Sequence, residues 1–272
     1  MFIAEIGINH GGDINIAKEL ILMAKRSGAN VVKFQKRNVE ENILPQDLNT
    51  TRETLKGTRS YLDYKTDLEF EIYAYREIDK FCKSINMPWT VSVWDITSVE
   101  FISQFDIPFI KVPSARINEL DLLEAINSTG IPVVLSTGMS SKEEVDSAIN
   151  ALDNLSCIMH CESIYPPKDN ELNLNIISYL KDCYPNIKIG YSSHDTSIYP
   201  MLCASTLGAE IFEAHITLNK NMIGSDQKCS FEEKELTEMI SLINKSKLWL
   251  GNKEITCLES EEPAKKKLRR KS

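Results

Sequence analysis

Eight short runs of apolar and β-branched residues recur along the chain, and stretches with helical spacing separate them. Alternation of this kind is typical of parallel βαβ units. Eight parallel strands close a barrel, and such a barrel needs about 250 residues. The sequence therefore predicts an α/β fold, a (β/α)₈ TIM barrel over residues 1–260, with a basic tail over 261–272. The predicted strands are Phe2–Gly7, Val31–Gln35, Thr90–Trp94, Phe109–Pro113, Val133–Thr137, Cys157–Cys161, Lys188–Ser192 and Ile211–Ile216.

The segments between these strands carry helical signals. Apolar residues at helical spacing predict helices over Ile16–Ser27, Ser140–Leu152 and Phe231–Leu250. About 50 residues separate the second and third strands, and only Asp67–Ser84 has the pattern of a long helix. The remainder, Lys36–Lys65, is too long for a simple link, so we expect a flap over the barrel mouth.

The composition of the chain indicates where the protein is located in the cell and which classes of partner it does not bind. No apolar run approaches the roughly 20 residues that cross a bilayer, and the N-terminal MFIAEIGINHGG lacks the basic region of a signal peptide. The seven cysteines show no zinc-like pairing. We therefore expect a cytoplasmic protein without a membrane partner. The net charge of −8 argues against nucleic acid, and the basic PAKKKLRRKS is typical of a solvated tail.

Polar residues gather where the predicted strands end, which is where such barrels place their active sites. Lys33 and Lys111 lie inside apolar strands, and a buried ammonium group is costly unless an anion pairs with it. Serines near four strand ends add hydroxyl donors for phosphate oxygens. The set predicts a site for a small phosphorylated acid. The serines are Ser114, Ser136, Ser163 and Ser192.

Two histidines lie at corresponding heights on the last two strands. His194 and His215 can meet on one divalent cation, and the alternative is a pair of satisfied histidines in a polar rim. Glu213 has the parity of His215, so it is either a third ligand or a hydrogen-bond acceptor behind the ligands. His160 is expected to point into the barrel, one turn deeper, in a core or supporting role.

A series of motifs resembles the sialic acid synthase family. They occur in order along the whole barrel: AEIGINHGGD, VVKFQ, LSTGMSS, HCESIYP, SSHDT, EAHITL and GSDQKCS. The resemblance implies a transferase that condenses phosphoenolpyruvate with an open-chain N-acetylated amino sugar. Its products are phosphate and a 2-keto-3-deoxy nonulosonic acid, and its cofactor is Mn²⁺ or Mg²⁺.

The resemblance also implies roles for individual residues. It assigns phosphoenolpyruvate contacts to Lys33, Lys111, Ser114, Ser136, Ser163 and Ser192. It assigns the metal to His194 and His215, and contacts with the sugar to Glu5, Gln35, Tyr165 and Asp226. The residues expected to act in catalysis are Glu5, Lys33, Lys111, Arg116 and Asp226. In the implied reaction the metal polarises the aldehyde, C3 of phosphoenolpyruvate attacks it, water adds at C2, and phosphate leaves.

Arg116 departs from the family pattern. Members commonly carry an acidic residue there, and an arginine cannot act as a base at ordinary pH. Arg116 is instead suited to bidentate binding of a phosphate or carboxylate, and heptulosonate synthases carry a similar Ala-Arg pair. This feature keeps open a second function, a synthase that takes a phosphorylated or acidic sugar.

The family usually continues into an antifreeze-like domain, which contacts the sugar in a partner subunit's site. This sequence stops where that domain would follow. The alternatives are that a separate protein supplies the antifreeze-like domain, that the acceptor is recognised without it, or that activity is lost. A second copy of the chain, in a homodimer, is a further expected partner. A third function also stays open, a catalytically reduced subunit that binds phosphoenolpyruvate and assists another synthase.

Overall fold

Eight parallel strands close into a barrel in the computed structural model, which describes residues 1–47, 50–54 and 57–270. The strand order around the barrel is β1-β10-β9-β8-β7-β6-β5-β2, so the predicted TIM barrel is confirmed. The strands are β1 Phe2–Gly7, β2 Val31–Lys36, β5 Trp89–Val93, β6 Ile110–Val112, β7 Val133–Ser136, β8 Leu155–Cys161, β9 Lys188–Ser193 and β10 Ile211–His215.

The barrel interior has an apolar end and a polar end. Near the strand N-termini the inward side chains form a buried apolar cluster, which includes Ile3, Val31 and Ile211. Two residues further along the same strands, the inward positions are Glu5, Lys33 and Glu213. Because side chains alternate between the two faces of a strand, one register fixes both layers. Each polar group in the upper layer therefore rests on a packed floor that excludes water from below.

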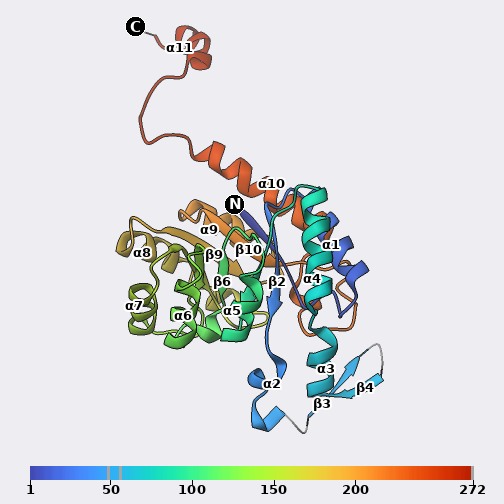
Figure 1. Cartoon of the computed structure of the whole chain (residues 1–272). Coiled ribbons are helices and arrows are strands. Elements are labelled where there is room, and N and C mark those ends of the chain that lie inside the picture. The colour runs from blue at the N-terminus through green and yellow to red at the C-terminus, as the bar shows by residue number, and fades with distance from the viewer. Residues whose placement is uncertain (48–49, 55–56, 271–272) are drawn as a thin grey trace.

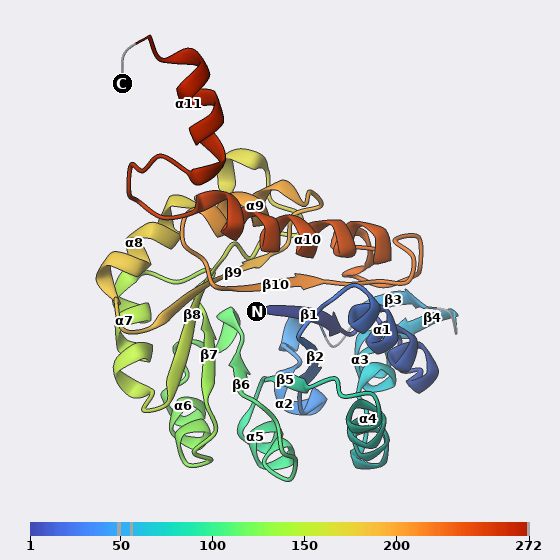
Figure 2. The ribbon, with the colours of Figure 1, turned by 90° about the horizontal axis from the view of Figure 1, so that it is seen from above.

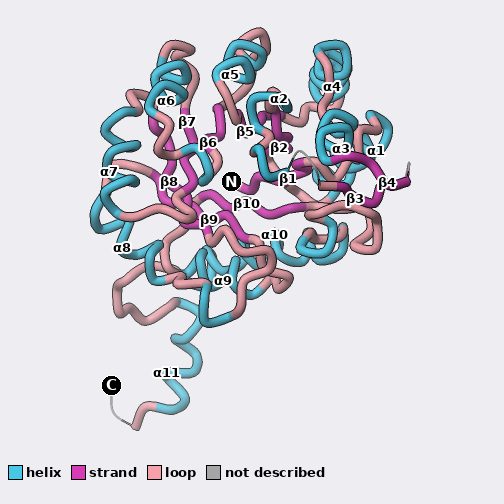
Figure 3. The backbone as a smooth tube through the Cα atoms, turned by 90° about the horizontal axis from the view of Figure 1, so that it is seen from below, coloured by secondary structure: helices cyan, strands magenta, loops and turns pink. Residues whose placement is uncertain are grey.

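Helices surround the barrel, as Figure 3 shows from the end where α2 (Val39–Asn42) and α3 (Tyr61–Leu68) lie. The larger apolar core lies between these helices and the outer faces of the strands. α1 begins after Asp13, whose side chain accepts a hydrogen bond from the Asn15 amide at 2.7 Å. The helices on the barrel wall are α1 Ile14–Arg26, α4 Ile72–Ser84, α5 Ile96–Ile102, α6 Leu120–Asn127, α7 Lys142–Ala151, α8 Asn175–Cys183, α9 Tyr199–Thr206 and α10 Glu233–Leu250.

The predicted flap contains secondary structure of its own. It comprises α2 Val39–Asn42, the hairpin of β3 Thr51–Thr54 and β4 Gly57–Ser60, and the start of α3 Tyr61–Leu68. Residues 48, 49, 55 and 56 of the predicted segment lie outside the described part. These elements gather at the end of the barrel into which β2 leads, at the bottom of Figure 1. The segment therefore lies at the barrel mouth.

The prediction of one helix over Asp67–Ser84 is wrong. The chain leaves helical geometry between α3 and α4, where Glu69 adopts an extended conformation. Glu69 accepts hydrogen bonds from Lys36 Nζ and from the Arg37 amide. Phe70 stacks on His10, with ring centroids 4.1 Å apart. Contacts with the end of β2 and the β1–α1 loop thus outweigh the helical pattern at this break.

The C-terminal segment leaves the barrel. α10 ends at Leu250, and a short helix, α11 Glu262–Leu268, follows after an irregular stretch. α11 projects away from the barrel in both Figure 1 and Figure 2. Residues 271 and 272 of the predicted tail lie outside the described part. Among the described helices, none is long and apolar enough to cross a bilayer.

His10 is a buried histidine that should make stability depend on pH. Burial lowers its pKa from 6.5 to about 4, so the folded state keeps it neutral where the unfolded chain protonates it. The neutral imidazole therefore stabilises the fold above pH 6.5. This contribution to the free energy of unfolding, about 3 kcal/mol, is lost as the pH falls towards 4. We expect His10→Phe, which retains a ring beside Phe70, to remove this dependence. Urea unfolding at several pH values measures it; a constant difference between the two proteins would contradict the prediction.

Gly12 allows the β1–α1 loop to pack closely on α3. Its φ is +79°, and a Cβ there would overlap the backbone carbonyl of Asp67. We expect Gly12→Ala to lower the free energy of unfolding by about 2–4 kcal/mol, because steric overlap adds to backbone strain. Gly11 is a matched control, since its φ is +60° but nothing lies within 4 Å of its Cβ position. Gly11→Ala should cost only about 1 kcal/mol, as measured by urea unfolding, and equal losses would show that packing on α3 does not matter.

Candidate active site

Strand register brings the predicted residues together at the barrel mouth. Glu5 on β1 lies opposite Lys33 on β2 and opposite His215 on β10. On the far side of β2, Gln35 lies opposite Ser92, and Ser92 lies opposite Lys111. Residues far apart in the sequence therefore share one layer because the strands are parallel and in fixed register.

Two lysines and two glutamates form a buried ion cluster. Lys33 Nζ lies 2.6 Å from Glu5 Oε2 and 3.7 Å from Glu213 Oε1. Lys111 Nζ lies 3.8 Å from the same Glu213 oxygen. These four side chains are at most 7% exposed. The lysines are thus already paired within the protein, a partnership that the sequence analysis did not predict for Glu5.

The cluster holds its members in different protonation states. For Glu213, burial opposes ionisation, but Lys111 and Lys33 outweigh it and lower the pKa to about 2. For Glu5, burial dominates and raises the pKa to about 7 although Lys33 opposes the rise. Burial also lowers the pKa of Lys111, whereas Glu213 and Glu5 outweigh burial at Lys33 and raise its pKa. One carboxylate therefore faces two ammonium groups, and the balance leaves positive charge for an anionic ligand.

A cavity of about 260 Å³ lies above this cluster. Serine hydroxyls accept hydrogen bonds from both lysines: Ser92 Oγ lies 2.7 Å from Lys33 Nζ, and Ser136 Oγ accepts from Lys111 Nζ. Ser192 Oγ donates to Glu213 Oε1 at 3.0 Å. Of the predicted site residues, eleven line the cavity: Glu5, Lys33, Lys111, Ser114, Ser136, Ser163, Tyr165, Ser192, His194, Glu213 and His215.

Gly138 lets the loop after β7 approach two of the serines. A Cβ at this glycine would lie 2.8 Å from Ser114 Oγ and would also overlap Ser163 Oγ. The Gly138 amide donates to Ser114 Oγ at 2.9 Å. The glycine in the LSTGMSS motif therefore keeps both hydroxyl groups at the cavity wall.

Three predicted residues lie outside the residues that line this cavity. Gln35 Nε2 donates to Glu5 Oε1 at 3.4 Å, so it touches the rim of the cluster. Asp226 Oδ2 lies 3.9 Å from His215 Nδ1. Arg116 donates to Glu119 and Asn42 and lies over the Trp94 indole, with Cζ 5.4 Å from the ring centroid. Two of its donors thus already have protein partners.

Sequence reasoning missed Ser92, Trp94 and Cys161, which also line the cavity. Ser92 had a usable signal, because it has inward parity at the C-terminal end of an apolar strand beside Lys33. The prediction that His160 points into the barrel is wrong. Its Nε2 bonds the Leu172 carbonyl oxygen at 2.9 Å, and its ring stacks on Tyr191 with centroids 5.8 Å apart. Cys161 takes the inward position instead, since neighbours on a strand face opposite sides.

His194 and His215 have features of a partial metal site. Their ring centroids are 5.6 Å apart. His194 Nδ1 donates to the Glu162 carbonyl oxygen at 2.7 Å, an arrangement that leaves Nε2 for a metal. His215 Nδ1 is buried and has no hydrogen-bond partner in the described part of the chain, and burial lowers the pKa of this imidazole to about 4, so it is neutral. The donor chemistry therefore fits a divalent transition metal.

In the described part of the chain, few side chains besides the two histidines are placed to bind this metal. Within the described ranges no group of three or more His, Cys, Asp or Glu side chains is placed to hold an ion. Glu213, a predicted third ligand or acceptor, directs its Oε1 towards the lysines and Ser192. Two imidazoles would leave the remaining coordination positions to water and substrate oxygens, as in an open catalytic site.

The family model and the most similar known proteins all indicate the same protein family. The model of the NeuB family matches residues 20–255. The N-acetylneuraminate-9-phosphate synthase of Homo sapiens is 36% identical over 98% of this chain and 75% of that protein. The N,N'-diacetyllegionaminic acid synthase of Campylobacter jejuni is 34% identical over 93% of this chain and 78% of that protein.

A solved structure agrees with these relatives. The crystal structure of N-acetylneuraminic acid synthetase from Leptospira borgpetersenii, in complex with citrate, superposes with a TM-score of 0.87. It is 30% identical, and the match covers 99% of this chain and 92% of that one.

Removal of one lysine should reveal how strongly the buried cluster depends on charge balance. Lys33→Met leaves Glu5 and Glu213 with less compensating charge, so we expect a loss of about 3–5 kcal/mol in the free energy of unfolding. Lys18→Met is the control, because the Lys18–Glu77 ion pair at 2.5 Å is on the surface and should contribute at most about 1 kcal/mol. Urea unfolding measures both. Equal losses in the two variants would contradict a desolvated cluster.

Proposed function

The chain belongs to the NeuB family, and on that basis we propose that it is a phosphoenolpyruvate-dependent synthase of a sialic-type acid. It condenses phosphoenolpyruvate with an N-acetylmannosamine-like aldose, which yields a 2-keto-3-deoxy nonulosonic acid and phosphate. The observation that carries the proposal is the pair of buried lysines at the barrel mouth, beside two histidines.

The lysines suit the binding of a small, highly charged donor. Lys33 and Lys111 offer ammonium groups that Glu213 only partly balances, and the serine hydroxyls around them can donate to phosphate oxygens. Because these groups are fixed by strands and buried, they need little rearrangement when charge develops on the leaving phosphate. Ser114, Ser136, Ser163 and Ser192 complete the proposed phosphoenolpyruvate contacts.

His194 and His215 would hold a divalent metal, for which we propose Mn²⁺ or Mg²⁺. Such an ion supplies Lewis acidity that polarises the acceptor's aldehyde oxygen. The Glu162 carbonyl oxygen orients His194, and the Tyr165 ring packs on His194 with centroids 4.0 Å apart. These contacts fix the imidazole at the side of the cavity where the acceptor would bind.

Proton transfer falls to the carboxyl groups of the site. Arg116 cannot act as a base, so Glu5 and Asp226 are the carboxyl groups in the proposed set that can take up or release protons. Burial raises the pKa of Glu5 to about 7, which suits proton exchange near neutral pH. Gln35 and Tyr165 are proposed to contact the sugar.

The relatives do not fix one acceptor, since one is named for a 9-phosphate product and another for diacetyllegionaminic acid. We favour an unphosphorylated amino sugar, because the two terminal nitrogens of Arg116 donate to Glu119 and Asn42. A homodimer belongs to the same proposal. So does a cytoplasmic setting, which the free state of the seven cysteines supports.

A phosphate-release assay tests the function. The protein is incubated with phosphoenolpyruvate, Mn²⁺ and one aldose from a panel of N-acetylmannosamine, its 6-phosphate, erythrose 4-phosphate and arabinose 5-phosphate. We expect phosphate release with an N-acetylmannosamine substrate and a nonulosonic acid in the mass spectrum. Release without sugar, or only with erythrose 4-phosphate or arabinose 5-phosphate, would overturn the sialic-type assignment.

Substitution of one proposed metal ligand provides a second test. We expect His194→Ala to lower turnover by on the order of 100-fold or more, since the metal would lose half of its protein ligands. His160→Gln is the control, because His160 is also buried near the end of β8 but bonds the Leu172 carbonyl oxygen, away from the cavity. Turnover and Mn²⁺ affinity are measured together. Unchanged Mn²⁺ affinity in His194→Ala would contradict the proposed site.

A further inference from the structure

Arg116 is the residue at which this chain departs from its family pattern, and the structure shows what holds it. It ends the short helical turn η2 Ser114–Arg116, directly after two residues that line the cavity. Its guanidinium lies over the indole of Trp94, which also lines the cavity. Nη1 donates to Glu119 and Nη2 donates to Asn42, whereas Nε is buried and has no hydrogen-bond partner among the described residues.

Asn42 is the last residue of α2, so the flap contributes one of the two partners of Arg116. Its amide also donates to the Asn38 carbonyl oxygen at 2.8 Å and to Asp95 Oδ2 at 2.7 Å. The side chain therefore bridges two groups. Its oxygen accepts from Arg116, and its nitrogen donates to Asp95 and to the Asn38 carbonyl oxygen, so both amide N–H groups are used in this one orientation.

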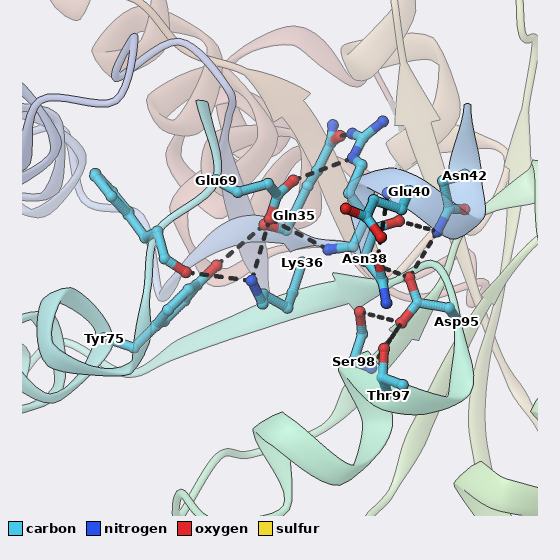
Figure 4. Close-up of polar contacts among 12 residues, drawn as sticks. Gln35, Lys36, Asn38, Glu40, Asn42, Glu69, Tyr75, Asp95, Thr97 and Ser98 are labelled. Carbon is cyan, nitrogen blue, oxygen red and sulfur yellow. Dashed lines mark hydrogen bonds and ion pairs between the residues drawn. The ribbon is translucent and has the colours of Figure 1, made fainter. Parts of the chain in front are cut away.

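Asp95 anchors this bridge to the barrel wall. Oδ1 accepts from the Ser98 amide at 2.7 Å and so begins α5, while Oδ2 accepts from the Asn38 amide at 2.6 Å and from Asn42. Figure 4 shows Asn38 and Asn42 of the flap converging on Asp95 from one side, and Thr97 and Ser98 from the other. Burial opposes ionisation, but these hydrogen bonds outweigh it and lower the pKa of Asp95, so it is a carboxylate.

From this geometry we infer that Asn42, fixed by Asp95, is a positioning residue that holds Arg116 beside Trp94 and thereby sets the affinity for the acceptor sugar. The inference rests on the proposed function, since it concerns the same cavity. Arg116 lies outside the residues that line the cavity and acts on it through Trp94, because a displaced guanidinium would no longer hold the indole at the cavity wall. Lys33 and Lys111 lie deeper and have no contact with Asn42, so the donor's affinity should not change with it.

Four variants test the inference: Asn42→Ala, Arg116→Ala, the double variant and a control, Asn38→Ala. The control removes the N-cap side chain of α2, which accepts from the Glu40 amide and donates to Glu41 Oε1. It leaves the backbone amide of Asn38 on Asp95, and Asn42 keeps its bridge to Arg116. Steady-state rates are measured with N-acetylmannosamine, phosphoenolpyruvate and Mn²⁺, and thermal melts check that each variant is folded.

We expect Asn42→Ala to raise the KM for N-acetylmannosamine about 10-fold, because a hydrogen bond to a charged group is lost. The KM for phosphoenolpyruvate should stay within about 2-fold, and Asn38→Ala should change neither KM by more than about 2-fold. In the Arg116→Ala background, Asn42→Ala should add less than about 2-fold, since coupled residues are not additive. If Arg116→Ala turns over too slowly for this double-mutant comparison, the inference is tested by the difference in acceptor KM between Asn42→Ala and Asn38→Ala.

Three results would overturn the inference. They are an acceptor KM in Asn42→Ala equal to that of Asn38→Ala, an equal rise in both KM values, or a full additional effect of Asn42→Ala without Arg116. If the wild-type protein uses no aldose of the panel, the proposed function has failed. Hydrogen exchange then tests the bridge alone: Asn42→Ala should speed exchange in residues 114–119, and exchange there equal to that of Asn38→Ala overturns the bridge as well.

Discussion

Two buried lysines share two glutamates at the mouth of the barrel, and the polar half of the interior depends on this charge balance. Lys33 lies 2.6 Å from Glu5, while Glu213 lies within 4 Å of both Lys33 and Lys111. Ions removed from water are stable only when partners and hydrogen bonds replace their hydration. The surrounding serines supply those hydrogen bonds. Because burial raises the pKa of Glu5 to about 7, the two ammonium groups are not fully neutralised near neutral pH. The remaining positive charge makes the cavity attractive to an anion such as phosphoenolpyruvate.

The barrel supports this cluster by separating apolar and polar layers. Residues such as Ile3 and Ile211 close the floor, and Glu5 and Glu213 occupy the next inward positions on the same strands. His215 continues β10 one step nearer the mouth, opposite Glu5. A single register therefore fixes the donor pocket and the histidines relative to each other. This geometry explains how the proposed metal and the proposed phosphoenolpyruvate site can lie side by side.

The flap connects the mouth with the barrel wall. Asp95 begins α5 and also accepts hydrogen bonds from Asn38 and Asn42 of the flap. Asn42 in turn accepts a hydrogen bond from Arg116. Without this bond only Glu119 and the Trp94 ring would restrain the Arg116 side chain, and more of its rotamers would be accessible. Under the proposed function, the flap is therefore part of the acceptor side of the site.

The sequence by itself determined the eight strands, the barrel and the inward positions of Lys33, Lys111 and His215, because the apolar pattern and the alternation of side chains along a strand are local properties of the chain. It misplaced His160 and continued one helix through Glu69, where local pattern and observed contacts disagree. Only the tertiary structure decided that Glu5 pairs with Lys33 and that Arg116 bonds Asn42. Those partners are 28 and 74 residues apart in the chain, and strand register and the path of a long loop bring them together.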